Sequence, residues 1–242
     1  MIAVPPHRMS ADQNALRTHR PFTRADLGRG TPRILNKGRW ANATVFVHDH
    51  DGTRWVIKDF SDCPALYRET VGRFMVSREL SALERLRGLA GVPAETFRID
   101  AYAFAYRFVP AIEMADAGPD RATPAFFRAL EAVVLAMHAR KIAHLELRNG
   151  GNILVGDDDQ PLLVDFQSHV KLNGLPRFLA RRLENVDLAG IYKHWSHRHP
   201  VSLGTERLAF LARANRWRRL WILKGYFGLK PQRSKNRPPA DS

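Results

Sequence analysis

The chain has 242 residues, 45% of them hydrophobic, and a formal net charge of +14. This length can bury a full hydrophobic core, and the single cysteine, Cys63, excludes a disulfide framework and a cysteine metal cluster. The first residues lack the apolar core of a signal peptide, and no apolar run reaches the roughly 18 residues that a membrane-spanning helix needs. We therefore expect a cytoplasmic protein whose positive charge attracts a polyanion.

The amino-terminal part predicts a basic arm followed by a β-hairpin. Residues 1–30 are polar and carry several arginines, so we expect a flexible arm there. Residues 44–48 alternate between apolar and polar side chains, an Asp-Gly pair then favours a turn, and residues 55–60 form an apolar returning strand. Lys58 lies in that returning strand.

Two amphipathic helices are predicted further along the chain. The first carries Glu79 and Glu84, and the Gly-Val-Pro sequence that begins at Gly91 ends it. Its apolar face repeats at steps of three and four residues: Val76, Leu80, Leu83, Leu86 and Leu89. Residues 97–109 then predict two more strands. The second helix begins at Thr123 or Pro124 and ends near Lys141, and its apolar face is Phe127, Leu130, Val133, Val134 and Met137.

The segment from His144 to Phe166 points to chemistry. Two apolar runs separated by an acidic turn predict a hairpin, with Asn152 where the first strand begins and Asp165 where the second ends. The hairpin brings these two side chains to one mouth, and Glu146 lies one loop away. Hard oxygen ligands in this arrangement suit Mg²⁺ and phosphoryl transfer. The plainer alternative is a solvated hairpin with ordinary turn acids.

This segment resembles the catalytic loop and the metal-binding segment of the protein-kinase-like fold. Glu146 stands at the position of the family's catalytic aspartate, and Asn152 and Asp165 stand at those of its metal ligands. The chain departs from the family pattern in three ways. The acid is a glutamate, the step to Asn152 is one residue longer, and Gln167 replaces the glycine that follows the metal-binding aspartate and its phenylalanine.

The resemblance implies an ATP site built from the amino-terminal elements. Lys58 would hold the phosphates of ATP and pair with Glu79, with Glu84 as the alternative partner. Gly38 and Val45 match the ends of the loop that covers the nucleotide, although the other glycines of that loop are missing. Fewer glycines imply a weaker or differently shaped contact between the backbone and the phosphates.

The sequence after Asp165 bears on the acceptor. An Ala-Pro-Glu motif, which ends the peptide-binding platform of protein kinases, is absent. By resemblance, Asp187 is the acid of the next helix, and it lies only about twenty residues after Asp165. This spacing favours a small-molecule, sugar or lipid acceptor over a peptide.

The carboxy-terminal part combines basic and aromatic residues in a helical pattern that ends near residue 229. Three interpretations remain open: a helix on an anionic membrane surface, a nucleic-acid surface, or a closing helix of the domain. The members of the pattern include Arg207, Arg213, Arg216, Trp217, Trp221 and Tyr226. Residues 230–242 are rich in proline and charge and predict a disordered tail.

Together these features resemble the bacterial lipopolysaccharide-kinase group, which includes the Kdo and core-heptose kinases. The resemblance implies an α+β fold of two lobes, a β-rich lobe at residues 31–111 and a mainly helical lobe at residues 112–229. It implies an ATP- and Mg²⁺-dependent kinase that phosphorylates a sugar or glycolipid hydroxyl at the cytoplasmic face of the inner membrane. Two alternatives remain: a pseudokinase that binds a nucleotide or a partner, and a basic nucleic-acid-binding protein, for which little besides charge argues.

Overall fold

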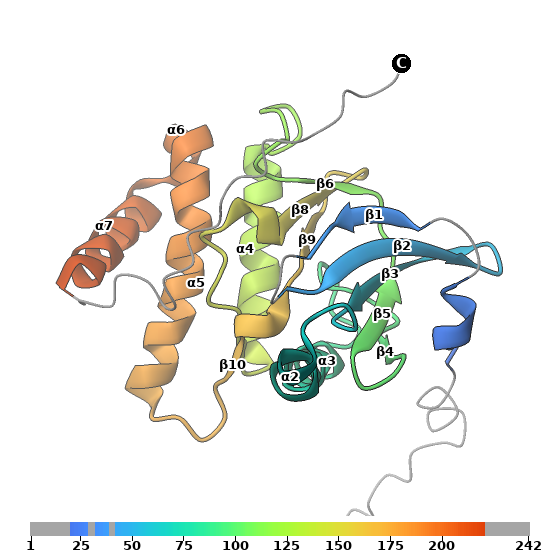
Figure 1. Cartoon of the computed structure of the whole chain (residues 1–242). Helices are drawn as coiled ribbons and strands as arrows, with labels where there is room; N and C mark the ends of the chain where they lie inside the picture. Colours follow the sequence, from blue (N-terminus) through green and yellow to red (C-terminus); the bar gives the residue numbers. More distant parts are fainter. Residues whose placement is uncertain (1–19, 29–31, 39–41, 221–242) are drawn as a thin grey trace, which may run out of the picture.

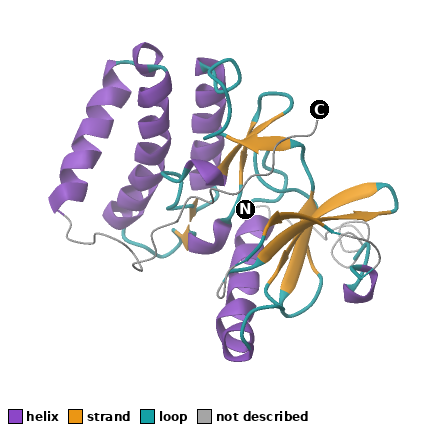
Figure 2. Cartoon of the chain, turned by 45° about the horizontal axis from the view of Figure 1, so that its top comes forward, coloured by secondary structure: helices purple, strands orange, loops and turns teal. Residues whose placement is uncertain are grey.

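The computed structural model describes residues 20–28, 32–38 and 42–220, and it consists of a β-rich lobe and a helical lobe (Figure 1). Figure 2 shows the strands of the first lobe beside a long helix, and the helices of the second lobe on the other side of the molecule. Two lobes of this kind are the architecture that the sequence predicts.

The amino-terminal lobe is built on one antiparallel sheet with the strand order β1-β2-β3-β5-β4. Its strands are β1 (Arg33–Asn36), β2 (Thr44–His50), β3 (Thr53–Asp59), β4 (Phe97–Arg98) and β5 (Ala103–Arg107). The turn between β2 and β3 has positive φ angles at Asp51 and Gly52, 47° and 71°, as a two-residue hairpin requires. Strand β3 has a neighbour on each side and is therefore buried along most of its length, including Lys58.

The helical segment of this lobe consists of α2 (Ala65–Tyr67), a π-helical turn η2 (Arg68–Gly72) and α3 (Arg73–Arg85). Helix α3 buries Val76, Glu79, Ala82 and Leu83. It is shorter than the predicted helix, which extended to Leu89. The chain leaves the helix at Leu86, and Gly88 then adopts a φ of 73°, a backbone conformation that glycine tolerates without strain.

The carboxy-terminal lobe begins with a small sheet of order β6-β8-β9, formed by β6 (Ala111–Glu113), β8 (Ile153–Gly156) and β9 (Pro161–Leu163). Strands β8 and β9 are the hairpin that the sequence predicts. A second pair joins β7 (Ile142–Ala143) to β10 (Val170–Lys171), so the chain after Asp165 runs back along the strand that precedes His144.

The helices of this lobe are α4 (Pro124–Ala139), α5 (Arg177–Arg198), α6 (Pro200–Leu203) and α7 (Thr205–Leu220). The Thr123 hydroxyl caps α4 by accepting a hydrogen bond from the Phe126 amide at 3.2 Å. The buried face of α4 includes Phe127, Leu130, Val134 and Met137 as predicted, while Val133 is only partly buried.

Helix α7 packs on the lobe in its first turns. The Arg207 guanidinium donates two hydrogen bonds to the Glu131 carboxylate, at 2.9 and 2.8 Å, and Leu211 is buried. This favours the closing-helix interpretation for the start of the basic and aromatic pattern. The residues beyond 220, including Trp221, Tyr226 and the predicted tail, lie outside the described part of the chain. Among the described helices, none has the length and apolar character to cross a membrane.

The segment at residues 20–28 differs from the flexible arm that we expected for residues 1–30. Phe22 is 2% exposed and packs edge-on against Trp55 and Phe97 on the sheet. The Arg24 guanidinium lies between the carboxylates of Asp59 and Asp100 and donates to both. One aromatic anchor and one bridging arginine therefore hold this segment, while residues 1–19 lie outside the described part.

We expect Arg24→Ala to detach residues 20–28 from the sheet. The change leaves the nearly buried Asp59 carboxylate without its cation, and the loss of hydrogen bonds to a charged group costs about 1–3 kcal/mol. Limited proteolysis should cut this segment faster, and urea denaturation should show the lower stability. Arg33→Ala, on the exposed strand β1, is the control. Equal protease resistance of the two variants would contradict the anchoring role.

Candidate active site

The centre of the site is an ion cluster that joins the two lobes. Lys58 Nζ lies 2.7 Å from Glu79 Oε2 and 2.6 Å from Asp165 Oδ1. Strand β3 supplies the lysine, α3 supplies the glutamate, and the chain just after β9 supplies the aspartate. Glu79, the partner preferred from the sequence, occupies this place, whereas Glu84 is exposed and pairs with Arg87.

Burial and charge act against each other at Lys58. Burial by itself lowers the pKa of a lysine, but the carboxylates of Glu79 and Asp165 outweigh it and raise the pKa of Lys58 above its usual value. Burial, together with the charge of Asp165, raises the pKa of Glu79. Lys58 is therefore a permanent cation at physiological pH, held in a place from which water is largely excluded.

Asp165 is aimed into the cluster by an unusual backbone conformation. Its φ and ψ are both 66°, in the left-handed region that aspartate tolerates better than most residues. The next amide, that of Phe166, donates to Glu79 Oε1 at 3.1 Å, and the Gln167 side-chain amide donates to Asp165 Oδ2 at 3.2 Å. Glu79 thus holds both the lysine and the backbone that carries the aspartate.

Glu146 and Asn152 lie in the loop that leads into β8. A short 3-10 turn, η3 (Gly150–Asn152), takes up the glycines of the longer loop. Asn152 is buried, and its side-chain nitrogen, Nδ2, lies 3.4 Å from the backbone carbonyl oxygen of Glu146. Among the described residues, no ion pair or hydrogen bond engages the half-buried Glu146 carboxylate. Its oxygens therefore remain able to accept a hydrogen bond from a bound molecule.

His144 has a structural place in this loop. The ring is fully buried, packs 4.7 Å from the Phe166 ring between centroids, and bonds through Nε2 to the Val164 carbonyl at 3.0 Å. The histidine therefore ties the loop of Glu146 to the segment of Asp165.

Asp187 on α5 holds the backbone of the same loop. This carboxylate is fully buried and accepts hydrogen bonds from the amides of His144 at 2.8 Å and Leu145 at 2.6 Å, and it lies 2.9 Å from His138 Nε2. One turn later, Gly190 lets the loop approach the helix, since a Cβ there would lie 2.8 Å from the Leu147 carbonyl carbon. Asp187 and Gly190 together fix how the loop sits on α5.

The structure describes only the two ends of the loop that we expected to cover a nucleotide. Val45 lies opposite Lys58 in the β2–β3 register. Gly38 lies so close to the chain beyond the loop that a Cβ would overlap the Asn42 carbonyl oxygen, which explains a glycine there. Residues 39–41, between these ends, lie outside the described part of the chain.

Asp165 and Asn152 carry the carboxylate and amide oxygens that Mg²⁺ accepts as ligands. Mg²⁺ is commonly bound by one or two protein side chains, with phosphates and water completing the octahedron. Within residues 20–28, 32–38 and 42–220, no group of three or more histidine, cysteine or carboxylate side chains forms a complete metal site. A partial donor set of this kind suits phosphate-assisted binding better than a permanent structural metal.

The structure adds residues that the sequence patterns did not reveal. The Gln167 side chain contacts Asp165 directly, although the sequence marked this position only as a missing glycine. His169 is buried and bonds through Nδ1 to the Phe166 carbonyl at 2.8 Å. Arg78 donates to backbone carbonyls of the same segment. The sequence carries no signal for the contacts of Arg78, because their acceptors are backbone carbonyls.

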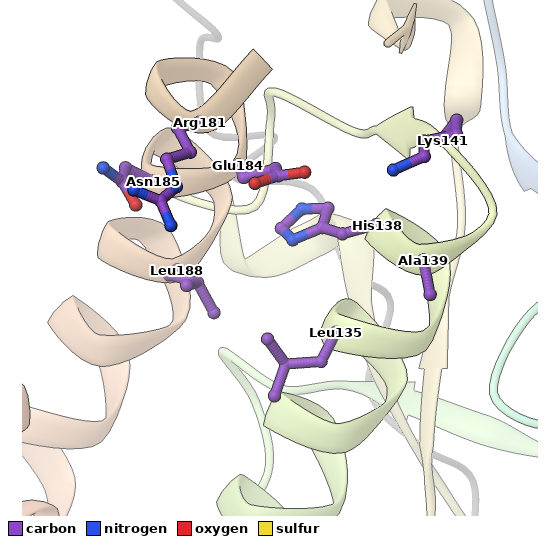
Figure 3. A pocket seen from close by; sticks show the side chains of 8 residues that line it. All are labelled: Leu135, His138, Ala139, Lys141, Arg181, Glu184, Asn185 and Leu188. Atoms are coloured by element: carbon purple, nitrogen blue, oxygen red, sulfur yellow. The ribbon is translucent and has the colours of Figure 1, made fainter. Parts of the chain in front are cut away.

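A separate surface hollow lies between α4 and α5, away from the ion cluster (Figure 3). Charged and apolar side chains line it, among them Lys141, Arg181 and Glu184. His138, the buried partner of Asp187, faces this hollow from α4. None of the residues that line the hollow belongs to the ion cluster or to the loop of Glu146, so the hollow is not part of the candidate active site.

No protein-family model and no curated protein matches this sequence. Among solved structures, the chain is similar to a Rio2 kinase in complex with ADP, Mg²⁺ and phosphoaspartate, from Chaetomium thermophilum. The TM-score is 0.54 at 16% sequence identity, covering 81% of this chain and 73% of that chain. A second structure of Rio2 kinase from the same organism gives a TM-score of 0.52 at 15% identity, covering 78% and 73%.

These similarities define the fold. The chain has a protein-kinase-like fold, with a β-sheet amino-terminal lobe and a helical carboxy-terminal lobe, and the predicted fold class is confirmed. In this fold, the cluster of Lys58, Glu79 and Asp165 lies between the two lobes.

We expect Asp187→Asn to destabilise the protein by about 1–3 kcal/mol, the usual cost of leaving a buried polar group unsatisfied. An asparagine keeps the size of the side chain but places an amide donor where Asp187 now accepts from backbone donors. Urea denaturation measures the free energy of unfolding. Glu184→Gln on the same helix is the control, and equal stability of the two variants would contradict the role of Asp187.

We also expect stability to fall as the pH drops from about 6.5 towards 4. Burial lowers the pKa of His169 to about 4, so below pH 6.5 the unfolded chain takes up a proton that the folded protein does not. Urea denaturation at a series of pH values should give a smaller slope for His169→Gln. His194, whose pKa burial also lowers to about 4, should retain part of the slope. A change at the exposed His197 should have no effect on it.

Proposed function

We propose that this protein is an ATP-dependent phosphotransferase that acts on a hydroxyl of a sugar, a glycolipid or another small non-peptide acceptor. The observation that carries the proposal is the buried Lys58, held by Glu79 and Asp165 between the lobes of a protein-kinase-like fold. The acceptor oxygen would form a bond to the γ-phosphorus as the bond to the ADP oxygen breaks. The acceptor's proton would pass to Glu146.

Each residue of the site has a role in this proposal. Lys58 would bind the phosphates of ATP, and Glu79 would keep the ammonium in place. Gly38 and Val45 would flank the loop over the nucleotide. Asp165 and Asn152 would hold Mg²⁺, which neutralises phosphate charge when it is bound. The similar Rio2 kinase forms a complex with ADP and Mg²⁺, which supports this choice of nucleotide and metal.

The unpaired carboxylate supports the role given to Glu146. A general base must be free to approach the proton that it accepts, and Glu146 makes no hydrogen bond through its side chain within the described residues. Its backbone, in contrast, is fixed, because its carbonyl accepts from the Asn149 amide at 3.0 Å. A fixed backbone with an unoccupied carboxylate suits the positioning of an acceptor hydroxyl.

The short segment after Asp165 supports a non-peptide acceptor. Helix α5 begins at Arg177, and within residues 166–176 the strand β10 pairs straight back onto β7. This leaves little chain for a peptide platform. The resemblance to lipopolysaccharide kinases favours a sugar hydroxyl of a lipid-linked acceptor. The net charge of +14 and the exposed Arg213 and Arg216 on α7 favour a peripheral position on an anionic membrane.

A pseudokinase is the second candidate, and the contacts of Asp165 favour it. Lys58 engages one carboxylate oxygen and Gln167 engages the other, so both oxygens that a metal would use already have a partner. Glu146 is also one methylene longer than aspartate. A displacement of about 1 Å at a reacting group can lower the rate about a hundredfold.

The test measures binding and transfer separately. The protein is titrated with Mg²⁺ and ATP by calorimetry, and then incubated with γ-labelled ATP and either a glycolipid extract of its source membrane or free sugars. We expect label in the glycolipid. Glu146→Gln should retain nucleotide binding but lower transfer by about 10²–10⁴-fold, the usual contribution of a general base.

Lys58→Ala and Asp165→Ala should lose transfer, while Glu84→Gln on the exposed face of α3 should behave like the unaltered protein. Nucleotide binding without transfer to any acceptor would favour the pseudokinase. Unaltered transfer by Lys58→Ala and Asp165→Ala would exclude this site as the catalytic centre.

A further inference from the structure

Helix α3 is attached to the carboxy-terminal lobe beside the ion cluster. Arg78, the residue before Glu79, donates from Nε to the Gln167 carbonyl at 2.7 Å and from a terminal nitrogen to the His169 carbonyl. Glu79 accepts from the Phe166 amide in the same segment. Adjacent residues of α3 therefore hold donors and acceptors of one short stretch after Asp165.

A second attachment lies at the end of α3. Arg85 donates from Nε to the Arg140 carbonyl at 2.5 Å and from a terminal nitrogen to Asn173 Oδ1 at 2.7 Å. Both acceptors belong to the carboxy-terminal lobe, one just after α4 and one between β10 and α5. The far end of α3 is thus fixed independently of the ion cluster.

A third attachment runs in the opposite direction. The Arg140 guanidinium donates to the carbonyls of Leu86 at 2.8 Å and Arg87 at 2.6 Å. These carbonyls follow directly after α3, at the end of the helix where carbonyl groups lack partners within the helix and the helix dipole is negative. The Leu86 carbonyl also accepts from the Leu89 amide at 2.9 Å, so the guanidinium adds a second donor there, and its charge interacts favourably with the dipole.

The residues around Arg78 favour its contacts with the carbonyls of Gln167 and His169. Its guanidinium lies 5.9 Å from the centroid of the Phe74 ring, one turn earlier on α3, which gives the half-exposed Phe74 a packing role. His169 is neutral near pH 7, since burial lowers its pKa to about 4, so it places no positive charge beside Arg78. Neither feature depends on a bound nucleotide.

We propose that Arg78, Arg85 and Arg140 form an arginine clamp that holds α3 on the carboxy-terminal lobe and thereby keeps Glu79 on Lys58 in the nucleotide-free protein. All but one of the acceptors are backbone carbonyls, which no modification switches on or off, and Asn173 supplies the other. The position of α3 is then a built-in property of the chain. These arginines are positioning residues, and their significance for catalysis rests on the proposed function.

Hydrogen–deuterium exchange of the full-length protein without nucleotide tests the clamp. Hydrogen bonds that involve a charged group are stronger than neutral ones, so losing one arginine should raise the local exchange rate about tenfold or more. We expect Arg78→Ala and Arg85→Ala to raise exchange in peptides that cover α3, and Arg78→Ala also in the peptide that covers Phe166. Peptides from the buried part of α4 should keep their exchange rates.

Arg73→Ala is the matched control, because Arg73 lies on α3 but is exposed and faces Glu69 at 3.5 Å on the same helical segment. Arg78→Lys should exchange at an intermediate rate, since an ammonium keeps the charge but lacks the planar fork that reaches two carbonyls. Exchange in Arg78→Ala and Arg85→Ala equal to that of Arg73→Ala would overturn the clamp. An equal rise in α3, α4 and α5 would also overturn it, because it would indicate a general loss of stability.

The exchange experiment contains no nucleotide and no acceptor, so its result does not depend on phosphotransfer. Faster α3 exchange in Arg78→Ala, combined with no transfer by the unaltered protein, would leave the clamp standing and remove the proposed function. Where transfer is found, Arg78→Ala should raise the KM for ATP about tenfold, because Glu79 then holds Lys58 for a smaller fraction of the time. Arg73→Ala should leave this KM unchanged.

Discussion

A buried lysine in the middle strand of a sheet is the constraint on which the rest of this structure depends. Strand β3 carries Lys58 between two neighbouring strands, where an unpaired ammonium would be very unfavourable. Carboxylates must therefore come to it, one from α3 and one from the segment after β9. Removing one partner of such a buried pair costs more than the pair contributes. The ion cluster thereby ties β3, the middle of α3 and the segment after β9 to one another.

A second buried acid organises the other side of the site. Asp187 accepts hydrogen bonds from the two amides at the start of the loop that carries Glu146. Gly190 allows that loop to lie against α5. The two acids differ in what they satisfy. Glu79 neutralises the Lys58 ammonium and accepts from one backbone amide, whereas Asp187 accepts from the two backbone amides at the start of the loop. Together they place the loop of Glu146 and the segment of Asp165 from opposite lobes, with His144 between them.

The sequence predicts those parts whose pattern is local. The Asp-Gly turn, the start of α4 at Thr123 or Pro124 and most of its periodic face follow from short-range rules, and the structure has them. The resemblance to the kinase family favoured Glu79 over Glu84 as the partner of Lys58. In the structure, Glu79 is buried beside Lys58, whereas Glu84 is exposed. The docking of Phe22 and Arg24 was not predictable, because one aromatic residue in a polar stretch gives no periodicity. The contacts of Arg78 and Arg140 leave no pattern either, because backbone carbonyls exist at every residue.

Exposure distinguishes the roles of the two carboxylates at Lys58. The Glu79 side chain is 3% exposed and also accepts a hydrogen bond from the Phe166 amide. If it left Lys58, its carboxylate would be buried without water to hydrate it. The Asp165 side chain is 30% exposed and held by Gln167 at its second oxygen, an amide contact that water or a ligand can replace. Asp165 is therefore the partner that can exchange the lysine for an incoming group without exposing an unpaired buried charge. The same ion cluster can hence stabilise the fold through Glu79, while Asp165 takes the ligand-binding role of the proposed function.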